Sequence, residues 1–327
     1  MSEIFYFCGH EQFQPEDIVE HAVIAEKYGF DGVMVSEHFN PWVSSKGASG
    51  FALSTLGAIA SRTSKIKIIT GVITPLFRYH PAIIAQAAAT IDRLSDGRFM
   101  LGLGTGEMIN EAPLGFEFPN YIERSERMNE AIDIIQKLLK GEKVTHNGKY
   151  YKTKNAKLYS PPKHNIPIFL AAGGPKSAIL AQNKVDGIIT SVKNIEDTKT
   201  NVINQAKKQA EHNTEPLKSI FATKWSVYAQ NKDEAFESLL SWRGLRVTSR
   251  NTESNPEVLE KEADNLPRDE ILNNYSIVSS SKQYIELYKP LIKELHAGYI
   301  AIQTTSLNQI DLIKMLGEKV VPELKKV

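Results

Sequence analysis

Short apolar runs alternate with longer amphipathic stretches along most of this chain. Eight of the runs are rich in β-branched and aromatic residues, which favour strands. Several are apolar at nearly every position, as is typical of parallel strands that are covered on both faces. The pattern predicts strands over residues 4–9, 31–39, 66–74, 99–104, 166–172, 186–190, 219–228 and 299–304.

Between these strands, apolar residues recur at the spacing of helices, and two of the predicted helices begin with a proline. The helices are expected over residues 15–28, 51–62, 81–94, 121–139 and 307–316. Strands that alternate with helices predict an α/β fold with a parallel sheet. A (β/α)8 TIM barrel with insertions fits eight such units, and an open doubly wound sheet is the alternative. The barrel is favoured because no change in composition divides the chain into halves, so we expect one domain over residues 1–327.

Two stretches interrupt the alternation and predict insertions, at about residues 144–160 and 246–282. In the first, Asn147 and Gly148 lie between β-prone residues, which is a hairpin signal. In the second, apolar periodicity lapses, and residues 247–266 are mostly polar or charged. A stretch of that length is usually a functional lid or a disordered segment.

The balance of charge and the cysteine count exclude several classes of function. The chain has 39 Lys and Arg against 38 Asp and Glu, a net charge of +1, whereas nucleic-acid-binding proteins usually have a basic excess. Cys8 is the only cysteine, so an intramolecular disulfide is excluded, and no HExxH or clustered His/Asp motif predicts a metal site. The first residues lack signal-peptide features, and no apolar run approaches the roughly 18 residues of a membrane span. We therefore expect a cytoplasmic protein that binds neither membranes nor nucleic acids.

Polar residues and glycines follow the predicted strands at their carboxyl ends, where barrel enzymes carry their active sites. His38 is a candidate general base because imidazole titrates near neutral pH, although a lone histidine is more often a packed or surface residue. The glycines of segment 102–106 form either a weak phosphate loop or a tight turn. A better candidate for binding an anion is Gly173-Gly174-Pro175, because Pro175 suits the first position of a helix. The alternative for that segment is an ordinary helix start.

Five segments together resemble the deazaflavin-dependent branch of the luciferase-like oxidoreductases, whose coenzyme is F420. They are EQF at 11–13, SEHFNPW at 36–42, TPLFRYHPA at 74–82, GTGEMINE at 104–111 and AAGGP at 171–175. The resemblance covers residues 4 to 324, and it implies a TIM barrel of the bacterial luciferase type that assembles as a homodimer. Coenzyme F420 would lie across the carboxyl ends of the strands.

The resemblance also assigns roles to single residues. His38, Glu107 and Trp42 fall on the family's catalytic positions, and Glu11 falls on a carboxylate near the substrate. The bond between Gly71 and Val72 falls where family members have a non-prolyl cis peptide. The residues assigned to the coenzyme are Glu37, Gly71, Val72, Thr74, Thr105, Gly106, Asn110, Ala171, Ala172, Gly173 and Gly174.

The implied reaction is hydride transfer from C1 of a sugar phosphate to the deazaflavin. Glucose 6-phosphate is the first expected substrate, giving 6-phosphogluconolactone. His38 is expected to act as the base and Glu107 as the proton donor, or the reverse, because paired groups shift each other's titration. Trp42 would shield and orient the deazaflavin ring.

For the substrate, the resemblance implies binding by Thr190, Lys193 and Lys261. The third basic residue of the sugar-phosphate enzymes has no clear match; Glu286 aligns near it, with Lys282 and Lys289 as stand-ins. Three alternatives stay open. They are an F420-dependent alcohol dehydrogenase, which would not need these lysines, an FMN-dependent monooxygenase of the wider family, and a barrel that binds its ligand without catalysis.

Overall fold

A closed barrel of eight parallel strands forms the centre of the computed structural model, which describes residues 1–327. Its strands are β1 (Glu3–Cys8), β2 (Gly32–Val35), β3 (Lys67–Thr70), β4 (Phe99–Leu103), β7 (Ile168–Ala171), β8 (Gly187–Ser191), β9 (Ser219–Tyr228) and β11 (Tyr299–Thr305). They follow the order β9-β11-β1-β2-β3-β4-β7-β8, and pairing between β8 and β9 closes the ring. All eight predicted strands are present, and the closure confirms the barrel over the open sheet.

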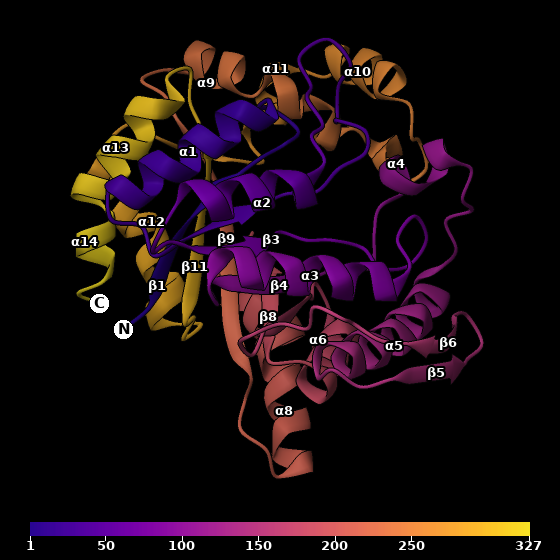
Figure 1. Ribbon diagram of the computed structural model, residues 1–327. Helices are drawn as coiled ribbons and strands as arrows, with labels where there is room; N and C mark the ends of the chain where they lie inside the picture. The colour runs from indigo at the N-terminus through magenta and orange to yellow at the C-terminus, as the bar shows by residue number, and fades with distance from the viewer.

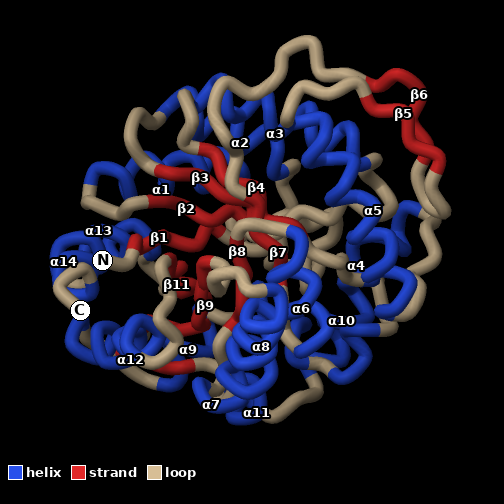
Figure 2. The backbone as a smooth tube through the Cα atoms, turned by 90° about the horizontal axis from the view of Figure 1, so that it is seen from below, coloured by secondary structure: helices blue, strands red, loops and turns tan.

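Helices surround the strands on the outside, as Figure 2 shows along the barrel. The five predicted helices are α1 (Pro15–Lys27), α2 (Ala52–Arg62), α3 (Pro81–Ser95), α5 (Tyr121–Leu139) and α13 (Gln309–Lys319). The outer layer also contains α6 (Pro175–Lys184), α7 (Ile195–Thr198), α8 (Asn204–Asn213), α9 (Lys232–Ser238), α12 (Ser281–Lys293) and α14 (Val321–Leu324). None of the helices combines the length and the apolar character needed to cross a membrane.

Side chains of the strands alternate between two cores, because successive residues of a strand face opposite sides. In β1, Ile4, Tyr6 and Cys8 pack outward against the helices, while Phe5 and Phe7 point into the barrel. Aromatic rings fill the end of the barrel where the strands begin. Phe5, Phe169 and Phe221 meet edge to face there, with ring centroids 4.9 and 5.9 Å apart. The barrel is therefore closed at this end, and any cavity must open at the carboxyl ends of the strands.

The first insertion is a hairpin, as predicted, made of β5 (Val144–Asn147) and β6 (Lys152–Ala156). Asn147 is the last residue of β5, and the turn spans the four residues that follow, so the Asn-Gly pair marks the end of the strand. The hairpin lies at the edge of the molecule beside α5 (Figure 1). Tyr151 in the turn donates a hydrogen bond to the carbonyls of Pro75 and Leu76, which ties the hairpin to the barrel.

The second insertion is ordered and largely helical. It contains η4 (Thr248–Asn251), α10 (Pro256–Asp264), α11 (Arg268–Leu272) and the short strand β10 (Ser276–Val278), and η3 (Leu240–Arg246) leads into it. Sequence periodicity missed α10 because this helix buries only Leu259 and Ala263, four residues apart. Arg243 of η3 fastens it by ion pairs with Glu260 and Asp264. In Figure 1 the insertion covers the same end of the molecule as the short helix α4 (Met108–Glu111).

Candidate active site

A cavity of about 830 Å³ opens at the carboxyl ends of the barrel strands. Each of the eight strands, or the loop that follows it, contributes to its wall. These contributions include Phe7, Met34, Gly71, Thr105, Ala171, Ile189, Thr223 and Gln303. Trp242 and Leu245 of η3, directly before the second insertion, also form part of the wall of the cavity.

The cavity brings together eleven of the residues that the sequence analysis assigned to the site. They are Glu11, His38, Trp42, Gly71, Val72, Thr105, Glu107, Ala171, Ala172, Gly173 and Gly174. Seven others do not line it. They are Glu37, Thr74, Gly106, Asn110, Thr190, Lys193 and Lys261.

His38 lies between two carboxylates. Its Nε2 atom is 3.3 Å from Oε1 of Glu11 and 3.4 Å from Oε2 of Glu107. The side chain of Glu11 is 5% exposed, whereas that of Glu107 is 48% exposed at the mouth. Water therefore screens the charge of Glu107 far more than that of Glu11. The three side chains are not arranged to hold a metal ion.

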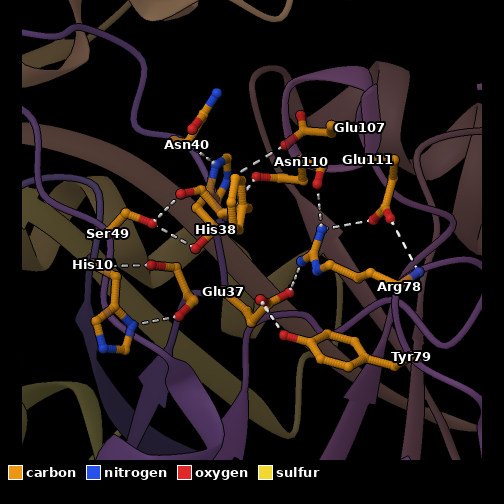
Figure 3. A network of polar contacts seen from close by, with 12 residues as sticks. His10, Glu37, His38, Asn40, Ser49, Arg78, Tyr79, Glu107, Asn110 and Glu111 are labelled. Atoms are coloured by element: carbon orange, nitrogen blue, oxygen red, sulfur yellow. Dashed lines mark hydrogen bonds and ion pairs between the residues drawn. The ribbon is translucent and has the colours of Figure 1, made fainter. Parts of the chain in front are cut away.

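The other nitrogen of the His38 ring fixes the tautomer. Nδ1 lies 3.1 Å from the backbone carbonyl of Asn40, which can only accept a hydrogen bond. Nδ1 therefore carries a hydrogen, and the lone pair or second proton of the ring is on Nε2. The ring thus keeps Nε2 free for proton exchange, and Figure 3 shows His38 beside Glu107, which lines the cavity with it.

A buried network holds Glu11 in place from behind. The Ser36 hydroxyl donates to Oε2 of Glu11 at 2.5 Å and accepts from the backbone N–H of His10 at 2.8 Å. The His10 ring is bound in turn to the Ser36 carbonyl and to the Thr55 hydroxyl. Burial lowers the pKa of His10, so its ring is neutral at physiological pH. Because Ser36 holds Oε2 of Glu11, the other carboxylate oxygen, Oε1, points toward Nε2 of His38.

Glu37 belongs to a second network, which faces away from the cavity. Its carboxylate pairs with Arg78 and accepts a hydrogen bond from Tyr79 at 3.1 Å. Arg78 also binds Glu111 at 2.7 Å and the carbonyl of Asn110 at 3.1 Å. Burial lowers the pKa of Arg78, but the two carboxylates outweigh burial and raise it overall. Figure 3 shows this guanidinium between the two carboxylates, beside the loop that carries His38.

Asn110 lies behind the cavity wall in the same region. Its side-chain oxygen accepts a hydrogen bond of 2.8 Å from the backbone N–H of Phe39, next to His38. Thr74 and Gly106 touch each other behind the wall, where a Cβ on Gly106 would lie 3.0 Å from Thr74. These residues, like Glu37, support the residues that line the cavity.

Three tryptophans form an aromatic side of the cavity. The ring of Trp42 lies 5.4 Å from that of His38. Trp225 and Trp242 meet edge to face at 4.5 Å, and Nε1 of Trp242 donates to Gln12. Sequence reasoning missed Trp225 and Trp242. The first stands inside a long strand, and the second precedes a polar insertion, so neither belonged to a recognisable motif.

Glycine-rich backbone forms another part of the cavity wall. The Gly71–Val72 bond is cis, as the resemblance implied. A Cβ on Gly71 would lie 2.3 Å from Met34, so only glycine leaves this wall undisturbed. Gly173, Gly174 and the first residues of α6 continue the wall, with open space around both glycines.

The two glycine-rich segments thus have different roles. The segment at 102–106 contributes only Thr105 to the wall, and Gly106 has a φ of 82°, which is typical of a tight turn. The turn interpretation is therefore correct for this segment. At 173–175, Pro175 begins α6 and the backbone of the helix start faces the cavity. This is the better of the two positions for an anion.

The basic residues expected at the substrate lie in different places. Lys193 is exposed in the loop after β8, two residues beyond Ser191 in the cavity wall. Lys261 is exposed on α10, on the opposite side of this helix from buried Leu259 and Ala263. Neither Lys282, Glu286 nor Lys289 lines the cavity; all three are on α12 in the outer layer.

The fold and the cavity define an enzyme of the α/β-barrel class, with an imidazole and two carboxylates at the carboxyl ends of the strands. Residues 2–295 match the luciferase-like monooxygenase family, and the chain belongs to that family.

Named relatives match over nearly the whole chain. An F420-dependent glucose-6-phosphate dehydrogenase of Kribbella flavida is 37% identical, with 99% of this chain and 98% of the relative covered. The enzyme of the same name from Amycolatopsis mediterranei is 35% identical, with 99% of both chains covered. Among solved structures, an F420-dependent secondary alcohol dehydrogenase bound to an F420–acetone adduct has a TM-score of 0.90 and 30% identity over 99% of both chains.

Proposed function

We propose that the protein is a coenzyme F420-dependent dehydrogenase that oxidises C1 of a sugar phosphate, with glucose 6-phosphate as the first substrate to test. The observation that carries this proposal is the position of His38 between Glu11 and Glu107, facing a cavity that could hold both coenzyme and substrate. The names of the full-length relatives support the coenzyme and the reaction.

The cavity fits the deazaflavin. A flat ring needs a wall without protruding side chains, and the backbone at Gly71 supplies one. The start of α6, at Gly173 and Gly174, offers backbone N–H groups and open space for an anionic part of the coenzyme. When bound, the coenzyme supplies the hydride acceptor of the reaction.

His38 is the base in this proposal. Nε2 takes the proton of the substrate hydroxyl at C1, while Nδ1 keeps its own hydrogen on the carbonyl of Asn40. The positive charge that the His38 ring acquires is stabilised by Glu11, whose carboxylate is buried and held by Ser36. Glu107 adds to this only after it has given up its own proton.

In this proposal Glu107 would supply the proton that the deazaflavin ring takes up together with the hydride. Its exposure at the mouth allows its carboxyl group to exchange protons with water, while Oε2 stays within 3.4 Å of His38. Trp42, against the His38 ring, shields the reacting atoms from water. Glu37, Thr74, Gly106 and Asn110 serve the coenzyme indirectly, by supporting the wall from behind.

A secondary alcohol is the alternative substrate, because the solved structure with a TM-score of 0.90 is named an alcohol dehydrogenase. A sugar phosphate and a simple alcohol undergo the same proton and hydride transfers at the hydroxyl-bearing carbon. They differ in the charge that the protein must bind, so the basic residues around the cavity distinguish them.

We also propose that the protein is a homodimer. Large apolar side chains are exposed at the N-terminal ends of neighbouring helices, namely Phe51 before α2, Ile83 in α3 and Ile122 in α5. Adjacent apolar groups of this kind commonly mark an interface. Light scattering during size-exclusion chromatography should give twice the chain mass of 36.5 kDa. A mass of one chain at micromolar concentration would contradict the dimer.

The main test mixes purified protein with oxidised F420 and glucose 6-phosphate and follows the loss of deazaflavin absorbance. Rapid loss supports coenzyme, reaction and substrate together. Loss with 2-propanol but not with the sugar phosphate would replace the substrate by an alcohol. Binding of FMN in place of F420 would indicate the monooxygenase, and tight F420 binding without turnover of any hydroxyl compound would indicate a non-catalytic barrel.

A further inference from the structure

Gln12 joins three parts of the structure that are far apart in the sequence. Its Oε1 atom accepts a hydrogen bond of 2.8 Å from Nε1 of Trp242 in η3, and one of 2.9 Å from the hydroxyl of Thr305 at the end of β11. Gln12 itself lies in the turn after β1, directly after Glu11. The middle residue of the EQF segment therefore has partners that the sequence did not indicate.

The two donors fix the orientation of the Gln12 side chain. An indole N–H can only donate, so the amide oxygen of Gln12 faces Trp242, and one carbonyl oxygen can accept both hydrogen bonds. Trp242 is 3% exposed and Thr305 is fully buried, so water has little access to either donor. Loss of the acceptor would leave both donors without a partner, which destabilises this arrangement of the side chains.

Packing also locates the indole of Trp242. It meets Trp225 edge to face at 4.5 Å, a geometry that aromatic pairs favour. A Cβ on Gly9 would lie 2.8 Å from Cζ2 of Trp242 and 3.5 Å from Oε2 of Glu11. The indole and the carboxylate thus border one small space, which the glycine at position 9 leaves free.

Glu11 and Gln12 share one tight turn but contact different partners. The carbonyl of Gly9 accepts a hydrogen bond of 3.2 Å from the backbone N–H of Gln12, which closes the turn. From this turn the side chain of Glu11 extends to His38, and that of Gln12 extends to Trp242. The hydrogen bond of Gln12 therefore ties the indole to the turn that carries the carboxylate.

We propose that Gln12 is a positioning residue for the reaction, because it holds the Trp242 indole beside Glu11 and so keeps the substrate carbon within reach of Nε2 of His38. The inference rests on the proposed function and deepens it. Gln12 does not line the cavity, so it acts through the indole, which does. A fixed wall matters because displacement of a substrate by about 1 Å can lower the rate about 100-fold.

Circular dichroism reports on the orientation of the indole. The electronic transitions of Trp225 and Trp242 couple at this short distance and should give a pair of bands of opposite sign in the far ultraviolet. Trp242→Phe should abolish the band pair and so assign it. Gln12→Met nearly keeps the length of the side chain but removes the acceptor, and it should reduce the band pair toward the level of Trp242→Phe. Gln12→Glu returns an acceptor oxygen and should restore the band pair.

Steady-state kinetics tests the consequence for the reaction. We expect Gln12→Met to lower kcat/KM for glucose 6-phosphate about tenfold, because the indole no longer has one fixed orientation in the wall. The F420 dissociation constant, measured by fluorescence quenching, should be unchanged, because the backbone at Gly71 and Gly173 is untouched. If Gln12→Met fails to fold, Gln12→Asn tests the same point, since it keeps an amide but shortens its reach by one methylene group.

Gln136→Met is the matched control. It removes a hydrogen bond of 2.6 Å from Nε2 of Gln136 to the carbonyl of Lys184, which joins α5 to the end of α6. Neither residue lines the cavity. The control should therefore change neither the band pair nor kcat/KM.

A double variant shows whether Gln12 acts through Trp242. If it does, Gln12→Met should lower kcat/KM no further in the Trp242→Phe background, because two changes to one interaction are not additive. Additive losses would give Gln12 a role independent of the indole and would overturn the inference.

The other failures are distinguishable. Absence of F420 reduction with every hydroxyl compound would remove the proposed function and with it the role in the reaction, even if the band pair shows that Gln12 orients the indole. A reduced band pair with unchanged kcat/KM would overturn the inference alone, because the orientation would then not matter for turnover. A band pair that is unchanged in Gln12→Met would also overturn it, since Gln12 would then not hold the indole.

Discussion

Nδ1 of His38 donates its hydrogen bond to the backbone carbonyl of Asn40, two residues along the same loop. The contact is local, so the ring orientation is set by the loop that carries the histidine. It leaves Nε2 as the only ring atom that can take up a proton from the cavity. The ring can therefore change its charge without losing the contact that orients it.

Replacement of this ring should remove most of the activity. We expect His38→Ala to lower kcat by about 10²–10⁴-fold, which is the usual range for the loss of a general base. The F420 dissociation constant should change little, because Trp42 and the backbone wall remain. Asn40→Ala is the matched control, since the variant keeps the backbone carbonyl that binds Nδ1. Full turnover in His38→Ala would remove the ring from the proposed chemistry.

Ser36 should act on the reaction through Glu11. Ser36→Ala leaves one carboxylate oxygen of Glu11 and the N–H of His10 without their partner. We expect kcat to fall about tenfold, which corresponds to about 1.4 kcal/mol, with KM nearly unchanged. Ser36→Thr should restore part of the loss, because it returns the hydroxyl. An altered KM with constant kcat, measured in steady-state assays, would contradict this positioning role.

Arg78 should matter for stability more than for chemistry. Arg78→Met leaves the buried carboxylates of Glu37 and Glu111 unpaired, and the loss of one partner from such a network costs about 3–5 kcal/mol. Arg268→Met is the control, because its ion pair with Asp233 is exposed and should contribute about 0–1 kcal/mol. Urea unfolding followed by circular dichroism measures both. Equal losses of unfolding free energy in the two variants would show that the buried network contributes no more to stability than an exposed ion pair.

Two glycines should respond to alanine in opposite directions. Gly57 lies within α2, and a Cβ there would meet no atom within 4 Å, so Gly57→Ala should stabilise the protein by about 0.5–1 kcal/mol. On Gly71, a Cβ would lie 2.3 Å from Met34 in the cavity wall. Gly71→Ala should cost about 1–3 kcal/mol and weaken F420 binding. Thermal unfolding measures the stability of both variants, and fluorescence titration measures their F420 affinity. Unchanged stability and F420 affinity in Gly71→Ala would mean that Met34 can move aside for the added Cβ.

His21 should make the protein sensitive to acid. Its ring is buried against Tyr6 and Phe13, and burial lowers its pKa from 6.5 to about 4. Between these values the unfolded chain binds a proton that the folded chain does not, so stability falls as the pH falls from 6.5 to 4. From pH 7 to 5 this loss amounts to about 2 kcal/mol.

His21→Leu should therefore reduce the difference in unfolding free energy between pH 7 and 5 by about that amount. His212→Leu, at an exposed position on α8, is the control and should keep the wild-type dependence. Urea unfolding at the two pH values makes the comparison. The same acid sensitivity in His21→Leu and in the wild type would assign the effect to other groups, His10 among them.

The sequence by itself determined the barrel and its family. Apolar runs of strand length and amphipathic stretches depend on neighbouring residues, so periodicity found all eight strands and five helices, within a few residues at most ends. Two strands end clearly earlier than expected, β2 at Val35 and β3 at Thr70, because the segments that follow them are loops that carry or support the site. Contiguous motifs likewise identified His38, Glu107 and the glycines at 173–174, which all line the cavity.

Only the tertiary structure decided which residues face the ligand and which charges are already paired. Glu37 stands next to His38 in the sequence, yet its carboxylate turns to Arg78, because neighbouring residues in extended chain point to opposite sides. Lys261 and Arg243 are both basic residues in or near the polar insertion. The folding of α10 turns Lys261 outward, whereas Arg243 is buried in ion pairs with Glu260 and Asp264. These ion pairs join residues 17 to 41 positions apart, and no local pattern records them.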